Sequence, residues 1–173
     1  MKGLSVLSPV ETYAGFYTAN RGRLFAYLLR LTGDYHLSND LVQESFTRCL
    51  ARYGRNGSNR ALLYTVARNA ALDAIRKRRE SPLEGDDELS PADSPERQLI
   101  DKESCQHMIA AIQKLGPDDR ELIALLATES FSYREIGKML RINEANVKVK
   151  VHRARLRLKA ILDSEPAEKQ NVP

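Results

Sequence analysis

Apolar residues in this chain recur mainly at spacings of three and four positions, which is the period of an amphipathic α-helix. In the first fifth of the sequence, Leu24, Tyr27, Leu28 and Leu31 follow this spacing and predict a helix that ends near Gly33. The chain has no sustained alternation of apolar and polar residues, which is the pattern of a half-buried strand. The pattern therefore predicts an all-α protein.

Two further helices are predicted before residue 80. One is expected to run from a Ser38 cap to Tyr53, and the other from about residue 60 to residue 79. The second of these ends in four adjacent cations, RKRR at 76–79. Such a cluster can neutralise several phosphates of a nucleic acid, although cations also complement the negative end of a helix dipole. The cluster therefore makes this helix a candidate nucleic-acid contact.

The segment 132–159 has the layout of a helix-turn-helix DNA reader, in which two short helices are joined by a tight turn. Ser132 and Glu135 stand at capping-box spacing and mark the start of the first helix. Gly137 leaves room for the second helix to cross closely, and Asn143 is expected to cap that second helix.

The second helix begins with small and polar residues, and cations follow on its outward side. The early residues are Glu144, Ala145 and Asn146, and the cations are Lys148, Lys150, Arg153, Arg155 and Arg157. In a helix that enters the major groove, early side chains reach base edges and later cations hold phosphates. The alternative is a solvated amphipathic helix whose cations only balance charge. The capped first helix and the short turn favour the DNA reader.

Charge is strongly segregated along the 173 residues, although the net charge is only +4. Residues 1–80 carry 13 basic and 6 acidic residues, whereas residues 105–173 carry 12 and 9. Between them, residues 81–104 carry 2 basic and 8 acidic residues together with Pro and Ser, a composition that cannot bury a core. We therefore predict two helical domains, 1–80 and 105–173, joined by a flexible acidic linker at 81–104. A long surface loop within a single domain is the alternative.

Three segments, taken together, resemble the bacterial extracytoplasmic-function (ECF) sigma factors of RNA polymerase, which belong to the sigma-70 family. They are DLVQESF at 40–46, LLYTVARNAALDAIRKRR at 62–79 and the stretch from LGPDDRELIALL to VKVKVHRARLRL at 115–158. The resemblance implies an N-terminal domain that binds core RNA polymerase and the minus-10 promoter element. It implies that this N-terminal domain also assists promoter melting, and that a C-terminal helix-turn-helix domain binds the minus-35 element.

The resemblance carries these roles to particular residues. The match to the polymerase-docking segment gives Asp40, Leu41, Gln43, Glu44 and Phe46, an acidic face with apolar residues at its edge. The match to the minus-10 segment gives Arg68, Asn69, Asp73, Arg76 and Arg79, and a base-capturing loop gives Asn56, Ser58 and Asn59. Asn69 and Asp73 could instead form internal hydrogen bonds that brace their helix against the domain. For the minus-35 element the residues are Glu144, Ala145, Asn146, Lys148, Lys150, Arg153 and Arg155.

Four positions depart from the family pattern. Leu62 replaces a usual Trp, Arg141 replaces a common Gly in the turn, Asn146 replaces Thr and Lys150 replaces Arg. A residue other than Gly at positive φ costs about 1 kcal/mol, so the turn is expected to differ slightly. The two changes in the second helix keep hydrogen-bonding capacity but alter the groups that a base would meet.

Other classes of protein receive little support. The chain has no P-loop, no HExxH and no Cys pair at metal spacing, so we expect neither an enzyme nor a cofactor. Cys49 and Cys105 are expected as reduced thiols on helices. No apolar run approaches the roughly 18 residues that span a bilayer, so a cytoplasmic protein without membrane insertion is expected.

Two other functions remain as alternatives to the sigma factor. A stand-alone helix-turn-helix regulator would bind specific duplexes without polymerase, whereas an interaction module without a nucleic-acid role would tolerate charge reversal at Arg76 and Arg79. The family resemblance also implies an anti-sigma factor as a partner, which the sequence itself does not show.

Overall fold

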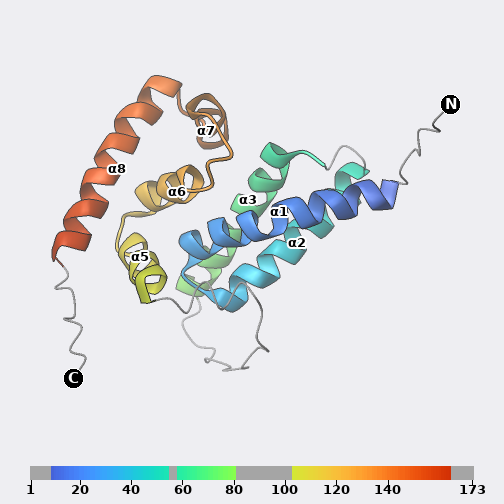
Figure 1. Cartoon of the computed structure of the whole chain (residues 1–173), viewed down its shortest axis with the longest axis horizontal. Helices are drawn as coiled ribbons and strands as arrows, with labels where there is room; N and C mark the ends of the chain where they lie inside the picture. Colours follow the sequence, from blue (N-terminus) through green and yellow to red (C-terminus); the bar gives the residue numbers. More distant parts are fainter. Residues whose placement is uncertain (1–8, 55–57, 81–102, 165–173) are drawn as a thin grey trace. The chain divides into compact units, whose positions relative to one another are not determined.

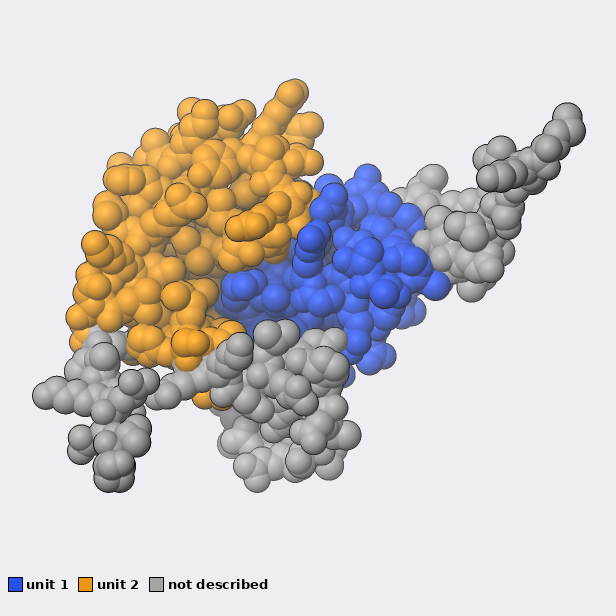
Figure 2. Space-filling view, viewed as in Figure 1, with its two compact units in different colours: residues 1–86 blue, residues 87–173 orange. Residues whose placement is uncertain are grey.

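The computed structural model describes residues 9–54, 58–80 and 103–164, and every regular element in these ranges is an α-helix (Figure 1). This confirms the predicted all-α class. The chain divides into two compact units, Met1–Asp86 and Asp87–Pro173, which Figure 2 distinguishes by colour. Most of the predicted linker, residues 81–102, lies outside the described residues.

The first unit contains α1 (Pro9–Thr32), α2 (Tyr35–Tyr53) and α3 (Arg60–Glu80), and each helix packs against the other two. The predicted apolar stripe of α1 lies in its core, where Leu24, Tyr27 and Leu28 have no exposed surface. The ring of Tyr27 lies 5.2 Å from that of Tyr64 in α3, centroid to centroid. Burial raises the pKa of Tyr64 to about 12, so this residue is a neutral core side chain.

The start of α2 differs from the prediction, because Asp34 and not Ser38 is its cap. The Leu37 amide donates to the Asp34 carboxylate at 2.8 Å. Ser38 lies within the helix, fully buried, and its hydroxyl donates to the Asp34 carbonyl oxygen. Asp34 therefore accepts a hydrogen bond from an otherwise unpaired amide in the first turn of α2. The Ser38 hydroxyl instead donates to the backbone of the preceding turn.

The second unit contains α5 (Glu103–Gln113), α6 (Pro117–Leu126), α7 (Tyr133–Leu140) and α8 (Glu144–Ser164). Helices α5, α6 and α7 all pack against α8. With 21 residues, α8 is not the short helix that was predicted. Its apolar side, which includes the buried residues Val147, Val151 and Ala154, gives three helices one common surface to cover.

The turn between α7 and α8 has the predicted local interactions. The Glu135 amide donates to the Ser132 hydroxyl at 3.3 Å, and the Ser132 amide donates to the Glu135 carboxylate at 2.8 Å, which completes the capping box. Arg141 ends α7 in the left-handed conformation, with φ 56° and ψ 40°. The Asn146 amide donates to the Asn143 side chain at 2.7 Å, so Asn143 caps α8 as predicted.

Gly137 allows the turn after α7 and the start of α8 to pack closely against α7 without a steric clash. A Cβ atom at this position would lie 2.7 Å from the carbonyl oxygen of Ile142 and 3.5 Å from the Val147 side chain. A real Cβ essentially never comes that close to an oxygen. The residue without a side chain therefore sets how closely the turn and α8 pack on α7.

Candidate functional site

An acidic and polar row runs along the outside of α2. Asp40, Gln43 and Glu44 are all exposed, and Glu44 forms an ion pair with Arg48 one turn later, at 2.5 Å. An ion pair between exposed side chains contributes little to stability, so this row is available for a partner. The predicted acidic face is therefore present on the surface of the first unit.

The two apolar residues predicted for the same face point inward instead. Leu41 and Phe46 are each only 3% exposed, so neither lies at the edge of a docking surface as expected. Phe46 is surrounded by aromatic rings of α1, with centroid distances of 4.7 Å to Tyr17 and 5.9 Å to Phe16. These two side chains hold α2 on the unit's core, because the helical period directs them away from the acidic row.

A hydrogen bond that the sequence did not suggest also fastens α2 to α1. The hydroxyl of Tyr13 donates to the backbone carbonyl of Phe46 at 2.5 Å. Burial raises the pKa of Tyr13, with a further contribution from nearby Cys49, so the hydroxyl stays a proton donor. Tyr13 therefore positions the helix that carries the acidic row.

The basic end of α3 is divided between internal pairing and exposed charge. Arg76 pairs with Asp73 on the same helix at 3.1 Å, and Arg78 reaches the α2 cap Asp34 at 2.7 Å. Arg79 is exposed, and within the described ranges no ion pair involves it. Asp73 therefore orients Arg76 and does not brace α3 against its domain.

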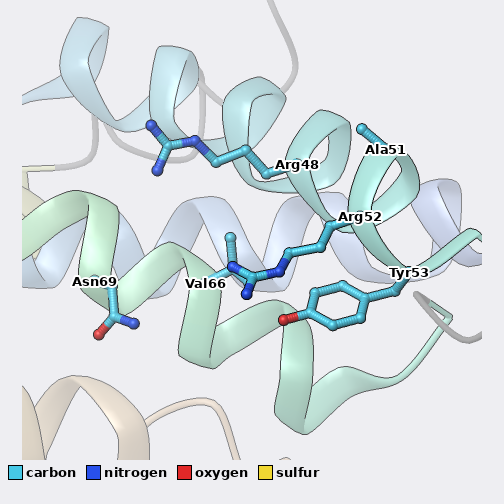
Figure 3. Close-up of a pocket in the computed structure, with 6 residues that line it drawn as sticks. All are labelled: Arg48, Ala51, Arg52, Tyr53, Val66 and Asn69. Carbon is cyan, nitrogen blue, oxygen red and sulfur yellow. The ribbon is translucent and has the colours of Figure 1, made fainter.

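An open pocket of about 530 Å³ lies between the end of α2 and the middle of α3 (Figure 3). Arg48, Ala51, Arg52 and Tyr53 line it from α2, and Val66 and Asn69 line it from α3. The guanidinium carbon of Arg52 lies 5.6 Å from the centre of the Tyr53 ring. A cation, an aromatic face and an amide in one open pocket suit a flat, hydrogen-bonding group such as a base.

Only Asn69 of the pocket residues was predicted for nucleic acid. The i, i+4 spacing of Arg48 and Arg52, which puts both cations on one side of α2, is a signal that could have indicated these two residues. Arg68, next to Asn69, is half-buried, whereas Asn69 is exposed at the pocket edge. The internal bracing role considered for Asn69 has no support, because no hydrogen bond of its side chain is found among the described residues.

The predicted base-capturing loop lies next to this pocket in the sequence. Asn56 falls outside the described residues, and Ser58 is half-buried. The side-chain oxygen of Asn59 accepts from the Leu62 amide at 3.1 Å and so starts α3 as its cap. Part of the hydrogen-bonding capacity that was predicted for a base thus serves the local fold.

The first turn of α8 presents the predicted small and polar residues to solvent. Glu144, Ala145 and Asn146 are all exposed. Lys148, one turn on, lies 3.3 Å from the Glu144 carboxylate, in a pair whose side chains are 62% and 47% exposed. Such a pair is weak in water, so Lys148 can exchange this partner for a phosphate.

The cations further along α8 divide between the two sides of the helix. Lys150 is half-buried and pairs with Asp118 of α6 at 3.7 Å, and Arg157 pairs with Asp119, which is itself almost buried. Arg153 and Arg155 are exposed. The cationic surface of α8 is therefore partly anchored to α6.

The described residues contain no cluster of three or more His, Cys, Asp or Glu side chains able to hold a metal ion. Cys49 is buried in α2 and Cys105 lies in α5, both as the free thiols that were predicted. No helix within those same ranges is long and apolar enough to cross a membrane.

Two family models match the chain, and they coincide with the two sets of helices. Sigma-70 region 2 matches residues 16–81, which hold most of α1 with α2 and α3. Sigma-70 region 4 matches residues 106–158, which hold α6, α7 and most of α5 and α8. The two matches place both units in the class of sigma-70 proteins.

Curated relatives specify the group within that class. The chain is 32% identical over 145 residues to the ECF RNA polymerase sigma factor SigM of Bacillus subtilis, covering 80% of this chain and 87% of the relative. It is 31% identical over 148 residues to EcfG of Rhodopseudomonas palustris, covering 84% and 82%. This chain therefore belongs to the ECF sigma factors of RNA polymerase.

Solved structures share the fold. The sigma factor RpoE of Bartonella quintana, solved with the anti-sigma factor NepR, has a TM-score of 0.65 and 24% identity, covering 90% of this chain and 97% of that one. CnrH, solved with the cytosolic domain of CnrY, has a TM-score of 0.65, 21% identity and 88% coverage of both chains.

Membership confirms the principal functional prediction. The protein binds core RNA polymerase and directs promoter-specific initiation of transcription. A stand-alone regulator is not favoured, because region 2 accompanies region 4 in the same chain. Sigma factors are regulatory proteins, and the polymerase that they serve carries out the chemistry.

Proposed function

We propose that the two units divide the work of promoter recognition between them. Residues 1–80 bind core polymerase and the minus-10 element, residues 105–173 bind the minus-35 element, and residues 81–104 tether the two. The observation that supports this proposal is that the first unit exposes an acidic row on α2, whereas the second unit exposes a cationic surface on α8. The minus-10 and minus-35 contacts, joined by a tether, bind one promoter more tightly than either contact alone.

The polymerase contact is assigned to the exposed residues of α2. Asp40, Gln43 and Glu44 form a row that suits a basic partner helix, since complementary charge speeds encounter and fixes register. Leu41 and Phe46 act behind that row by holding α2 in place. Charge reversal in the row should therefore weaken polymerase binding without unfolding the unit.

The minus-10 contact is assigned to the pocket and the basic end of α3. Asn69 and the pocket residues of α2 would receive an unstacked base, while Arg68, Arg76 and Arg79 neutralise phosphates and Asp73 orients Arg76. Ser58 and Asn59, with Asn56 outside the described residues, border this region in the sequence. An already melted strand needs no further energy to open, so base capture would stabilise the melted promoter.

The minus-35 contact is assigned to α8. Glu144, Ala145 and Asn146 would meet base edges, and the cations after them would meet the phosphates. Those cations are Lys148, Lys150, Arg153 and Arg155. The pair of Lys150 with Asp118 of α6 is weak, because the Asp118 side chain is 86% exposed, so Lys150 can exchange this partner for a phosphate.

The remaining assignments follow from family membership. The protein would act in the cytoplasm, where the polymerase works, and would need no cofactor or catalytic residue of its own. An anti-sigma factor is a fitting partner, because two solved structures with this fold are complexes with such a protein or with a partner's cytosolic domain. A partner that covers the α2 row or α8 would block polymerase or promoter.

The test is run-off transcription with purified core polymerase and a pool of promoter fragments, using the full chain. Wild type should give defined start sites. Asp40→Arg should fail to bind core, whereas Lys148→Glu should bind core but lose most initiation, because it opposes a phosphate contact. Start sites that depend on neither residue would contradict the division of labour.

Matched controls separate specific contacts from general charge effects. Asp163→Arg repeats the acid-to-cation change at an exposed position of α8, and Lys159→Glu repeats the other reversal far from the start of that helix. Both controls should retain wild-type core binding, and initiation should fall far less than with Lys148→Glu. Specific duplex binding without polymerase-dependent initiation would instead favour the stand-alone regulator.

A further inference from the structure

The solvent-exposed side of α8 carries an aligned row of side chains in addition to its Lys and Arg residues. At about 100° per residue, four side chains fall opposite the buried line of Val147, Val151 and Ala154. We call them the outer stripe: Ala145, Val149, His152 and Leu156. All four are exposed, and they contain two of the few large apolar side chains that the described residues expose.

Val149 is the unexpected member of the outer stripe. Its side chain is 49% exposed, although a branched residue is a weaker helix former than the charged residues around it. A single exposed apolar residue is common on protein surfaces. Val149, however, lies among the cations of α8, at an exposed position where neither core packing nor helix propensity favours valine.

Cations border the outer stripe on both sides. They are Lys148 and Arg155 along one edge and Arg153, Arg157 and Lys150 along the other, with Arg153 nearest to the stripe. On the second edge, Arg157 pairs with the nearly buried Asp119 of α6, whereas the pair of Lys150 with the exposed Asp118 is weak. In the major groove, two phosphate backbones flank a floor of base edges, so this arrangement matches a groove with the outer stripe facing the bases.

We propose that Val149 determines promoter specificity by contacting the 5-methyl group of a thymine in the minus-35 element. This inference rests on the proposed role of α8. Valine has no hydrogen-bonding group, and the thymine methyl is the apolar group that base edges present in the major groove. Val149 lies about 7.5 Å from the start of α8, within the part of a recognition helix that meets bases.

The other members of the outer stripe fit less well. Ala145 lies one turn earlier, among the residues assigned to base edges, but its single methyl group offers a thymine methyl less apolar surface than the Val149 side chain does. Leu156 is 56% exposed but lies about 10 Å further along the axis, beyond the turns that a recognition helix places against bases. Leu156 is therefore the matched control, because it is apolar and similarly exposed but lies further along the helix axis.

The test replaces thymine by deoxyuridine, which lacks only the 5-methyl group. Core polymerase with wild-type protein first selects a promoter from a random pool, and each thymine of the minus-35 element is then replaced in turn. Initiation is measured for wild type, Val149→Ala and Leu156→Ala. At one or two positions, wild-type initiation should fall about fourfold, the value of one buried methyl group.

The decisive result is the coupling between protein and DNA changes. Val149→Ala should initiate about fourfold less on the thymine promoter and should lose all further sensitivity to deoxyuridine there. Leu156→Ala should keep the wild-type sensitivity. Deoxyuridine sensitivity that persists in Val149→Ala, that is absent in wild type, or that vanishes in both variants would overturn the assignment.

Failure of this inference is distinguishable from failure of the proposed function. If wild type directs initiation but shows no methyl dependence through Val149, only the specificity assignment falls. If wild type directs no initiation from the pool, the proposed role of α8 falls together with it. Unchanged thermal unfolding of Val149→Ala, expected for an exposed side chain, shows that the variant is folded.

Discussion

The two units both start a functional helix on a capping side chain, but they secure that start differently. In the second unit, Asn143 caps α8 next to the capping box of α7, and each of these bonds joins residues three positions apart. In the first unit, Asp34 caps α2 and also receives Arg78 from the far end of α3. The start of α8 is a local structure, whereas the start of α2 depends on the folded unit.

This difference affects what each helix can present to a partner. The first turn of α8 is set by its own neighbours and by Gly137, so its exposed residues stay in place without help from a distant element. The acidic row of α2 is held by Asp34 at its start and by the aromatic contacts of Phe46 further along. Substitutions at these supports should therefore act locally in one unit and across helices in the other.

The largest effect is expected for Gly137→Ala, which breaks the local start of α8. The added Cβ would lie 2.7 Å from the Ile142 carbonyl, so the turn must shift. Overpacking of this kind costs about 2 kcal/mol. Hydrogen exchange of the full chain should show faster opening of α7 and α8, with α1 to α3 as the internal reference. Unchanged exchange in α8 would mean that the close approach is unimportant.

Asp34→Ala is expected to come next, because it removes both supports of α2. Loss of the cap to the Leu37 amide costs about 1 kcal/mol, and loss of the ion pair to Arg78 adds less. Thermal unfolding measured on α1 to α3 should fall accordingly. Asp34→Asn is the control, since it keeps a capping oxygen and removes only the charge. An equal loss in both variants would assign the effect to Arg78 alone.

Arg141→Gly should stabilise the turn between α7 and α8 in the second unit. Arg141 has φ 56°, where a side chain is strained by about 1 kcal/mol and glycine is not. Because glycine also loses more freedom on folding, the net gain should be under about 1 kcal/mol. The unfolding midpoint of α7 and α8 should rise slightly, with Arg141→Ala as a control that should not gain. A lower midpoint for the Gly variant would contradict the strain.

The smallest expected effect is the loss of stability of the first unit at acidic pH. Burial raises the pKa of Asp34, but the bonds from Leu37 and Arg78 outweigh it, so its pKa lies below the usual value. The stabilisation is therefore present above about pH 4 and disappears as the pH falls through the lowered pKa. Wild type and Asp34→Asn should converge in stability below that range. A constant difference between them at every pH would contradict the linkage.

Residues of α7 and α8 were predictable almost one by one, because their structure depends on hydrogen bonds within a single turn. The capping box, the Asn143 cap, the room at Gly137 and the strained Arg141 all appear in the structure. The length of α8 was underestimated, and this 21-residue helix packs against α5, α6 and α7.

Residues of the first unit were predictable as elements but less so as partners. The helices ended where expected, yet the cap of α2 was assigned to Ser38, and Leu41 and Phe46 were assigned to the edge of the docking face, whereas both are buried. The pocket that joins Arg52 and Tyr53 to Asn69 was missed, because these residues come from two helices. Nothing in local spacing states which sides of two helices will meet.

The sequence by itself determined the all-α class, the positions of most helix ends, the segregation of charge and the membership that family segments reveal. These follow from periodicity, from capping side chains within four residues and from composition, all of which are local quantities. Tertiary structure alone decided which cations are paired across helices, that Asp34 supports α2 and which rings of α1 surround Phe46. Those outcomes depend on packing, which brings together residues far apart in the chain.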